Sequence, residues 1–224
     1  MKEKMRFERK YLLDEDSAFL LKQRVSAVLA PDAHAPGGHY RVHSLYFDDQ
    51  YNSAFHEKQN GVLRRDKFRA RFYDGNMEPL RLELKHKHGE MVRKEAFPLT
   101  SEQYRMMLRG DYAFMRDTDS PVARQFYTTH LLKRLRPVVM VEYQRQAFTQ
   151  RTGNVRITFD SELVAKAPAA EHGFSVRPGA DTIMEIKYDH FLPASVEGLF
   201  SGLPFTQQLP LSKFCMAVLV MRGR

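Results

Sequence analysis

The sequence predicts an α+β domain built on an antiparallel sheet of about eight strands, and three observations support this prediction. Segments in which apolar and polar residues alternate recur along most of the chain, and a period of two is typical of half-buried strands. Helical patterns lie between or after these segments. Some predicted strands are joined by short turns, as at 149–154, and short connections favour antiparallel pairing.

The first part of the chain is predicted to alternate between strands and helices. Alternating residues predict a strand at 6–12. A helix is expected next, at 16–29, because acidic and capping residues at 14–17 mark its start. A second alternating segment predicts a strand at 40–48, and a helical pattern predicts a helix at 53–60.

Three predicted strands follow in the middle of the chain, at 66–73, 80–86 and 91–99. Apolar residues occupy every second position in the first two, so that each of these strands has one apolar face. The polar run that begins at Ser101 predicts the start of a helix at 101–109.

The last part of the chain is predicted to contain a helix at 120–135, three further strands and a terminal helix. Alternation places the strands at 137–148, 154–164 and 183–189. The terminal helix is expected at 210–221, where the residues are mostly apolar and show no alternation.

The composition limits the class of protein. The 224 residues suit one domain, expected to span 1–224, because domains usually have about 50 to 250 residues. With 43% hydrophobic residues the chain can bury a core, which excludes intrinsic disorder as its main state. Cys215 is the only cysteine, so an internal disulfide and a cysteine-based zinc cluster are excluded.

The sequence contains no membrane-spanning or secretory signal. The longest apolar run, at 215–221, is far shorter than the roughly 20 residues that a membrane-spanning helix needs. Charges are scattered through residues 1–13, where a signal peptide would have an apolar block. We therefore expect a cytoplasmic protein. No feature of the sequence predicts an oligomeric interface.

The charge balance predicts a polyanionic partner. The chain has 35 basic and 27 acidic residues, which gives a formal net charge of +8. Many of the cations lie on predicted strands, as Arg69 and Arg71 do on the face opposite Phe68, Ala70 and Phe72. Two such cations are about 7 Å apart, so their repulsion is unfavourable unless an anion lies near them.

Two arrangements fit these charged stripes. An open antiparallel sheet would turn its charged face to water. A sheet closed into a barrel, with helices packed outside, would enclose that face in a wet, positive tunnel.

In the second arrangement the tunnel is strongly basic. The cations that would face its lumen are Lys10, Arg69, Arg71, Lys85, Lys87, Lys94, Arg145, Arg156 and Lys187. The carboxylates that would oppose them are Glu8, Glu83, Asp160 and Glu185. Burying such a surplus of positive charge without water or counter-ions is too costly. The tunnel would therefore bind an oligophosphate. Its carboxylates could hold Mg²⁺ or Mn²⁺, which prefer oxygen ligands.

Nine short segments of the chain resemble the polyphosphate polymerase domain of the vacuolar transporter chaperone (VTC) complex, which is one of the triphosphate tunnel metalloenzymes. The segments are ERKYLL at 8–13, SLYFDD at 44–49, FRARFY at 68–73, LELKHK at 82–87, VRKEAF at 92–97, VEYQRQAF at 141–148, VRITFD at 155–160, MEIKY at 184–188 and LSKF at 211–214. They span almost the whole chain in the order found in the family. The resemblance implies an eight-stranded antiparallel tunnel, with helices packed outside it and a C-terminal helix that closes one end.

The resemblance also implies roles for individual residues. The positions expected to act on the triphosphate of the nucleotide or on the product chain are Lys10, Arg69, Arg71, Lys85, Lys94, Arg145, Arg156 and Lys213. Lys87, Lys187 and Ser212 are expected to complete the binding of the phosphate ligand.

The carboxylates expected to bind the metal ion are Glu185, at the family's metal-binding position, and Glu8. The hydrolytic branch of the superfamily has the first-strand pattern Glu-x-Glu-x-Lys. Here Glu8-Arg9-Lys10 supplies one glutamate. The smaller acidic set favours phosphoryl transfer to a phosphate chain over hydrolysis by two metal ions.

The implied function is that of a metal-dependent polyphosphate polymerase, which transfers the γ-phosphate of ATP to a growing inorganic polyphosphate chain with Mn²⁺ or Mg²⁺. Two alternatives stay open: a triphosphatase that hydrolyses tripolyphosphate or nucleoside triphosphates, and a non-catalytic subunit that binds polyphosphate or inositol phosphates. No nucleic-acid-binding motif occurs, so nucleic acid is not an expected partner. The sequence also has no P-loop, so a nucleotide site of that type is excluded. The yeast-type complexes add a phosphate-sensing domain and membrane helices that this sequence lacks, so any membrane partner is expected to be a separate chain.

Overall fold

The computed structural model describes residues 6–33, 35, 37–89, 91–176, 182–202 and 209–223. The strands are β1 (Arg6–Leu13), β2 (Ala30–Pro31), β3 (Tyr40–Asp48), β4 (Arg64–Tyr73), β5 (Asn76–His88), β6 (Met91–Pro98), β7 (Arg136–Gln150), β8 (Val155–Lys166), β9 (Phe174–Ser175) and β10 (Thr182–Tyr188). The α-helices are α1 (Glu15–Val28), α2 (Ser53–Gln59), α3 (Ser101–Leu108), α4 (Pro121–Lys133), α5 (Ala194–Glu197) and α6 (Lys213–Arg222).

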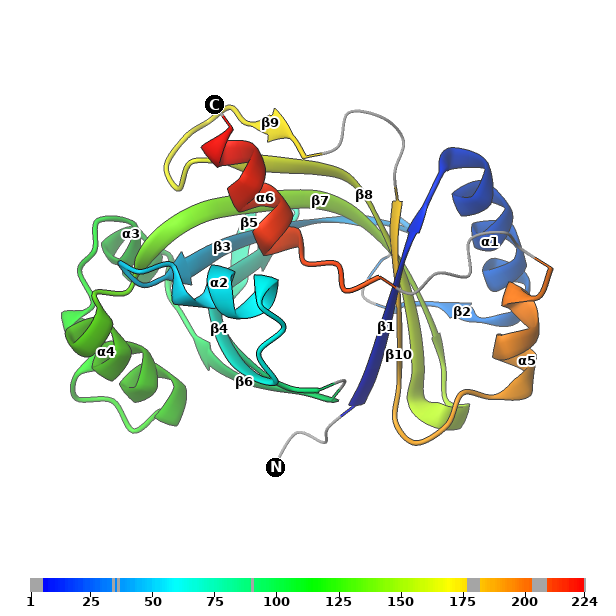
Figure 1. The fold of residues 1–224 in the computed structure, drawn as a ribbon, viewed down its shortest axis with the longest axis horizontal. Helices are drawn as coiled ribbons and strands as arrows, with labels where there is room; N and C mark the ends of the chain where they lie inside the picture. Colours follow the sequence, from blue (N-terminus) through cyan, green and yellow to red (C-terminus); the bar gives the residue numbers. More distant parts are fainter. Residues whose placement is uncertain are drawn as a thin grey trace.

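The eight long strands form a closed antiparallel ring (Figure 1). Each pairs with the next in the order β7-β3-β4-β5-β6-β1-β10-β8, and β8 pairs with β7 to close the ring. The two-residue strands β2 and β9 pair with β7 and β8 and extend the sheet beside the ring. The predicted α+β fold, with an eight-stranded antiparallel tunnel, is confirmed.

Most of the helices cover the outside of the ring. Buried Met107 of α3 and Phe126 of α4 belong to one apolar cluster with Phe68 and Leu82 of the neighbouring strands. On the other side, α1 packs its own apolar face against β8 and β10 in a second cluster. Figure 1 shows α3 and α4 at one end of the molecule and α1 and α5 at the other.

The C-terminal helix α6 lies across the inside of the ring instead. Its buried Phe214 and Val218 share an apolar cluster with Val141 and Tyr143 of β7. Met140, the neighbour of Val141 on the same strand, belongs to the cluster under α3 and α4. Because successive strand residues point to opposite faces, Val141 and Tyr143 face the lumen. The helix α6 therefore fills one end of the ring, as the resemblance implied (Figure 1).

Local sequence explains where the predicted helices begin. Asp14 caps α1 by accepting the backbone N–H of Ser17, and Thr100 and Gln103 form a capping box at the start of α3. Ser212 caps α6, which begins three residues later than the sequence predicted because the cap fixes the first helical residue at Lys213. The sequence did not predict β2, β9 or α5, whose two to four residues are too few for a periodic pattern.

Within the described ranges, no helix combines the length and the apolar character needed to cross a membrane.

Candidate functional site

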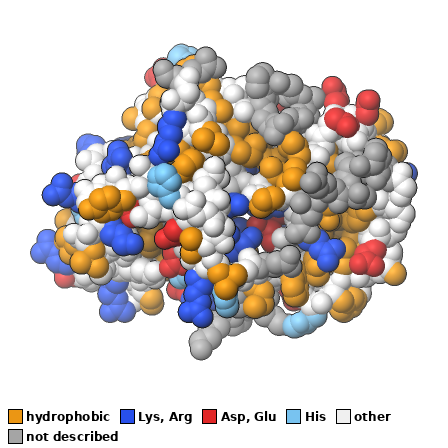
Figure 2. Space-filling view, viewed as in Figure 1, with side chains coloured by type: hydrophobic (Ala, Val, Ile, Leu, Met, Phe, Trp, Pro, Cys, Tyr) orange, Lys and Arg blue, Asp and Glu red, His pale blue; other side chains and the backbone are white. Residues whose placement is uncertain are grey.

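A strongly basic cavity of about 160 Å³ lies inside the ring. Among the described residues that line it are thirteen Lys or Arg side chains but only two carboxylates, Glu8 and Glu185. In the space-filling view, basic side chains are visible at the floor of a hollow near the centre of the molecule (Figure 2). The cavity is therefore enclosed by protein and carries a large excess of positive charge.

The structure brings all of the predicted site residues together in this cavity. The residues concerned are Glu8, Lys10, Arg69, Arg71, Lys85, Lys87, Lys94, Arg145, Arg156, Glu185, Lys187, Ser212 and Lys213. Their individual roles stay predictions. Their position inside a closed ring excludes the other arrangement considered above, in which the charged face of an open sheet meets bulk solvent.

The antiparallel register explains why charged side chains from separate strands point into the same space. Lys10 of β1 lies directly opposite Glu185 of β10. Lys67 of β4 lies opposite Lys85 of β5, which in turn lies opposite Lys94 of β6. Cross-strand partners point to the same face of a sheet, and like charges placed directly opposite each other are unfavourable. A row of three lysines therefore requires an anion or a carboxylate nearby.

Three lysines surround the carboxylate pair. The Nζ atom of Lys10 lies 3.0 Å from Oε1 of Glu8 and 3.2 Å from Oε2 of Glu185. Lys85 donates to both oxygens of Glu8 at 3.0 Å, and Lys187 pairs with Glu185. Burial and the neighbouring carboxylate oppose ionisation of Glu8, but the lysines outweigh them and hold its pKa below the usual range. Both glutamates are thus ionised and poorly basic.

The carboxylate pair fits a divalent ion only in part. Both glutamates contact the ammonium group of Lys10, and carboxylate oxygens are ligands that Mg²⁺ and Mn²⁺ prefer. The described ranges contain no group of three or more His, Cys, Asp or Glu residues that could hold a metal ion. Phosphate oxygens of a ligand would have to complete the coordination.

Asp160 lies directly opposite Arg145 on the inner face of the ring, where it holds two of the cations in place without lining the cavity itself. Its side chain is fully buried and accepts hydrogen bonds from Nε and Nη2 of Arg145 at 2.6 and 2.7 Å. Nζ of Lys213, at the start of α6, lies 2.6 Å from Oδ2, the oxygen that also accepts from Nη2 of Arg145. Burial raises the pKa of Asp160, but Arg145 and Lys213 together lower it to about 2. This carboxylate therefore ties α6 to β7 and β8.

Other cations of the cavity have no such carboxylate partner. Buried Arg71 donates to the hydroxyls of Ser44 and Tyr143, both at 3.0 Å, and forms no ion pair within the described part of the chain. Burial lowers the pKa of Lys67 to about 8 and that of Lys94 to about 7, although nearby Glu83 favours the charged form of Lys94. An anion bound between these side chains would restore their full charge.

The structure adds residues that sequence reasoning missed. Lys67 lines the cavity, and its alternation with Arg69 and Arg71 on one strand could have revealed it. Lys58 of α2 and Arg65 at the start of β4 also line the cavity, but only the tertiary fold places them there. Tyr46 lies with its hydroxyl 3.4 Å from Nη1 of Arg69. Although burial raises its pKa, Arg69 and Arg71 lower it to about 8.

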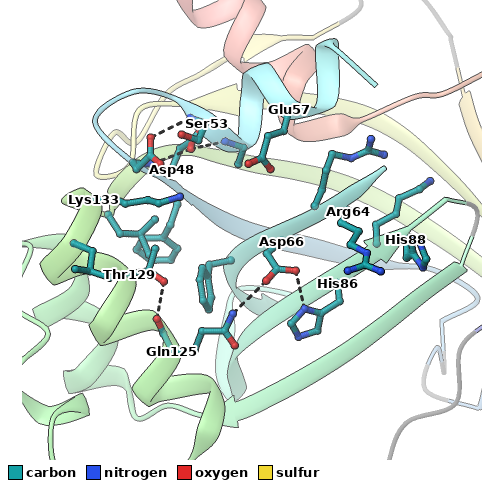
Figure 3. Close-up of a pocket in the computed structure, with 18 of the residues that line it drawn as sticks. Asp48, Ser53, Glu57, Arg64, Asp66, His86, His88, Gln125, Thr129 and Lys133 are labelled. Atoms are coloured by element: carbon teal, nitrogen blue, oxygen red, sulfur yellow. Dashed lines mark hydrogen bonds and ion pairs between the residues drawn. The ribbon is translucent and has the colours of Figure 1, made fainter. Parts of the chain in front are cut away.

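A larger cavity of about 580 Å³ lies outside the ring, between β4, β5, α2 and α4 (Figure 3). Its charges are mixed, and several already have partners: Asp66 accepts from Gln125 at 3.2 Å and lies 2.7 Å from Nδ1 of His86. Asp48 caps α2 by accepting the N–H groups of Ala54 and Phe55. This outer groove lacks the excess of positive charge that marks the cavity inside the ring.

Comparisons with known proteins agree with the fold. The family model of the VTC domain matches residues 5–222. Among solved structures, the adenylyl cyclase candidate HpAC1 from Hippeastrum, described as having a dominant triphosphatase activity, aligns with a TM-score of 0.52 and 14% identity over 90% of this chain and 85% of its own. PH1819 from Pyrococcus horikoshii OT3 aligns with a TM-score of 0.50 and 12% identity over 98% of this chain and 99% of its own. The comparison with curated proteins found no match.

Proposed function

The chain belongs to the VTC domain family, and from this premise we propose that it is a polyphosphate polymerase. It would transfer the γ-phosphate of ATP to the end of a growing inorganic polyphosphate chain inside the ring. The observation that carries the proposal is the enclosed excess of cations: the described lining residues include thirteen Lys or Arg and two carboxylates, and the excess remains after Glu83 and Asp160 pair with three of these cations. Only a ligand with several negative charges offsets that excess, and a linear phosphate has both the charge and the shape for a tunnel.

The chemistry of the lining favours transfer over hydrolysis. Water is a weak nucleophile that benefits from a general base. No histidine is among the described residues that line the cavity, and the carboxylates of Glu8 and Glu185 are held by lysines. The terminal phosphate of a chain is already ionised and needs no base. This comparison supports a phosphate acceptor.

In the proposed reaction, a terminal oxygen of the chain attacks the γ-phosphorus of ATP in line. A new P–O bond forms, the bond between the γ-phosphorus and the β–γ bridging oxygen breaks, and ADP leaves with the bonding electron pair. Arg69, Arg71 and Lys94 would orient the phosphates and neutralise the charge that spreads over the transferred group. A divalent ion, bound by Glu8, Glu185 and phosphate oxygens, would supply further charge neutralisation.

Product analysis tests the proposal. The purified full-length chain is incubated with ATP and either Mn²⁺ or Mg²⁺, and the products are sized on a gel while ADP and orthophosphate are measured. A polymerase forms long-chain polyphosphate and releases one ADP for each phosphate that it adds to the chain. Release of orthophosphate alone would establish a triphosphatase, the activity described for HpAC1. Tight polyphosphate binding without turnover under any divalent metal would establish a non-catalytic subunit.

A further inference from the structure

The cavity inside the ring continues into a second chamber of about 350 Å³. The second chamber is also lined by Gly61, Leu63, Gly89 and the segment Leu209–Leu211. Five charged residues line both spaces, and these are Glu8, Lys10, Lys58, Arg65 and Lys87. We call this second space the outer chamber. A ligand longer than the inner cavity could continue into it without leaving the positive lining.

Three cations from three different elements meet where the two spaces join. Lys58 comes from α2, Arg65 from β4 and Lys87 from β5, and the last two lie directly opposite each other across the strands. Burial, together with the charges of Arg65 and Lys87, lowers the pKa of Lys58, which shows how near these cations are to one another.

Two of these three cations have no carboxylate partner in the part of the chain that the structure describes. Neither Lys58 nor Arg65 forms an ion pair with any described residue, and Arg65 donates instead to the carbonyl oxygen of Val62. Among the described residues that line the outer chamber, Glu8 is the only carboxylate, and it is already held by Lys10 and Lys85. Like-charged neighbours without a counter-charge are unfavourable unless an anion lies between them.

We infer that the outer chamber binds the part of a polyphosphate chain that extends beyond the reacting phosphates, with Lys58 and Arg65 as its chain-binding residues. The inference rests on the proposed function because the polyphosphate chain is the acceptor or the product of the proposed reaction. The chemical class of the ligand is a linear polyphosphate too long for the inner cavity. Lys58 and Arg65 lie where the two spaces join, so a short phosphate such as tripolyphosphate, held beside Arg71 and Lys94, would reach them at most with one end.

Binding measured with two ligand lengths tests this inference. The full-length protein and its Lys58→Gln and Arg65→Gln variants are titrated calorimetrically with tripolyphosphate and with long-chain polyphosphate. We expect each substitution to weaken the binding of long-chain polyphosphate about fivefold to tenfold, because each removes a charge-assisted contact. The affinity for tripolyphosphate should change less than about twofold.

Arg64→Gln provides a matched control. Arg64 is the neighbour of Arg65 on the same strand, and both line the outer groove, but exposed Arg64 lines neither the inner cavity nor the outer chamber (Figure 3). The substitution removes the same charge from the opposite face of β4 and should leave both affinities unchanged. Thermal unfolding midpoints of all three variants should stay close to that of the unmodified protein.

Three outcomes would overturn the inference. In the first, Lys58→Gln and Arg65→Gln leave the affinity for long-chain polyphosphate unchanged. In the second, they lower the affinities for both ligands equally. In the third, Arg64→Gln lowers the affinity for long-chain polyphosphate as strongly as Arg65→Gln. Because binding is measured without turnover, a protein that binds long chains through these residues but synthesises none would refute the polymerase while leaving this inference intact.

Discussion

Replacing Arg71 by alanine should lower the turnover of polyphosphate synthesis by a factor of about 100 or more, the loss typical when one preorganised charge donor is removed from a transition state. The Arg71 side chain is 5% exposed and its guanidinium group has no carboxylate partner among the described residues. Its charge is therefore available to phosphate oxygens. The hydroxyls of Ser44 and Tyr143 only fix its direction.

The same substitution should cost little stability. Arg69 lies close enough for its charge to oppose that of Arg71, so removing one cation relieves repulsion and offsets the lost hydrogen bonds. Steady-state kinetics of product formation and thermal unfolding should be measured together on the full chain. A control is Arg81→Ala, which removes the exposed cross-strand neighbour of Arg71 and should leave turnover unchanged. Normal product yield from Arg71→Ala would refute the role of this residue.

Replacing Asp160 by asparagine should lower the free energy of unfolding by about 3 to 5 kcal/mol near neutral pH, because it leaves the buried charges of Arg145 and Lys213 without their partner. Glu162→Gln is the matched control on the same strand. Its ion pair with Arg41 is largely exposed to solvent, so its loss should cost less than about 1 kcal/mol. Chemical denaturation of both variants measures the two losses. Equal losses would contradict the assignment of Asp160 as the anchor of α6.

The stability that Asp160 contributes should depend on pH in a defined direction. Its pKa falls from an ordinary value of 3.8 to about 2 in the folded protein. A lowered folded-state pKa means that the contribution is complete above about pH 4 and is lost as the pH falls towards 2. The shift corresponds to about 2 kcal/mol. The difference in unfolding free energy between the unmodified protein and Asp160→Asn should therefore shrink over this range, and a constant difference would contradict the low pKa.

The strands of this fold were readily predicted because alternation persists through nearly every one of them. All eight strands of the ring were found, with boundaries that the structure mostly extends, as when 80–86 becomes Asn76–His88. Closure of the ring was harder to predict than the strands. It depends on the pairing of β7 with β8 and on the contact of β1 with β6, where two pairs of described residues meet. The short turn at 149–154 indicated the pairing of β7 with β8. Alternation does not encode the contact of β1 with β6, and only the family resemblance indicated that the ring closes there.

The candidate site was also predictable only in part, because some of its residues follow from strand patterns and others only from the tertiary fold. Arg145 shares a strand face with the apolar residues Val139 and Val141, so alternation alone argued against it. The structure gives the reason: α6 fills that end of the lumen, so the inner face of β7 is apolar beside the helix and charged beyond it. Lys58 could not be predicted from alternation because it comes from a helix, α2, whose Phe55 packs in the same apolar cluster as Phe214 of α6. Glu83 and Asp160 lie on the inner face of the ring, as expected, because they are directly opposite Arg69 and Arg145. They pair with these arginines and are not among the described residues that line the cavity.

A crystal structure of the protein with bound tripolyphosphate tests most directly whether the enclosed cations form a binding site for linear phosphates. The ligand should lie inside the ring, with its oxygens in contact with Arg71, Lys94 and Lys213. Density for tripolyphosphate in the outer groove of Figure 3, or on the surface with the ring interior filled by water alone, would contradict the account.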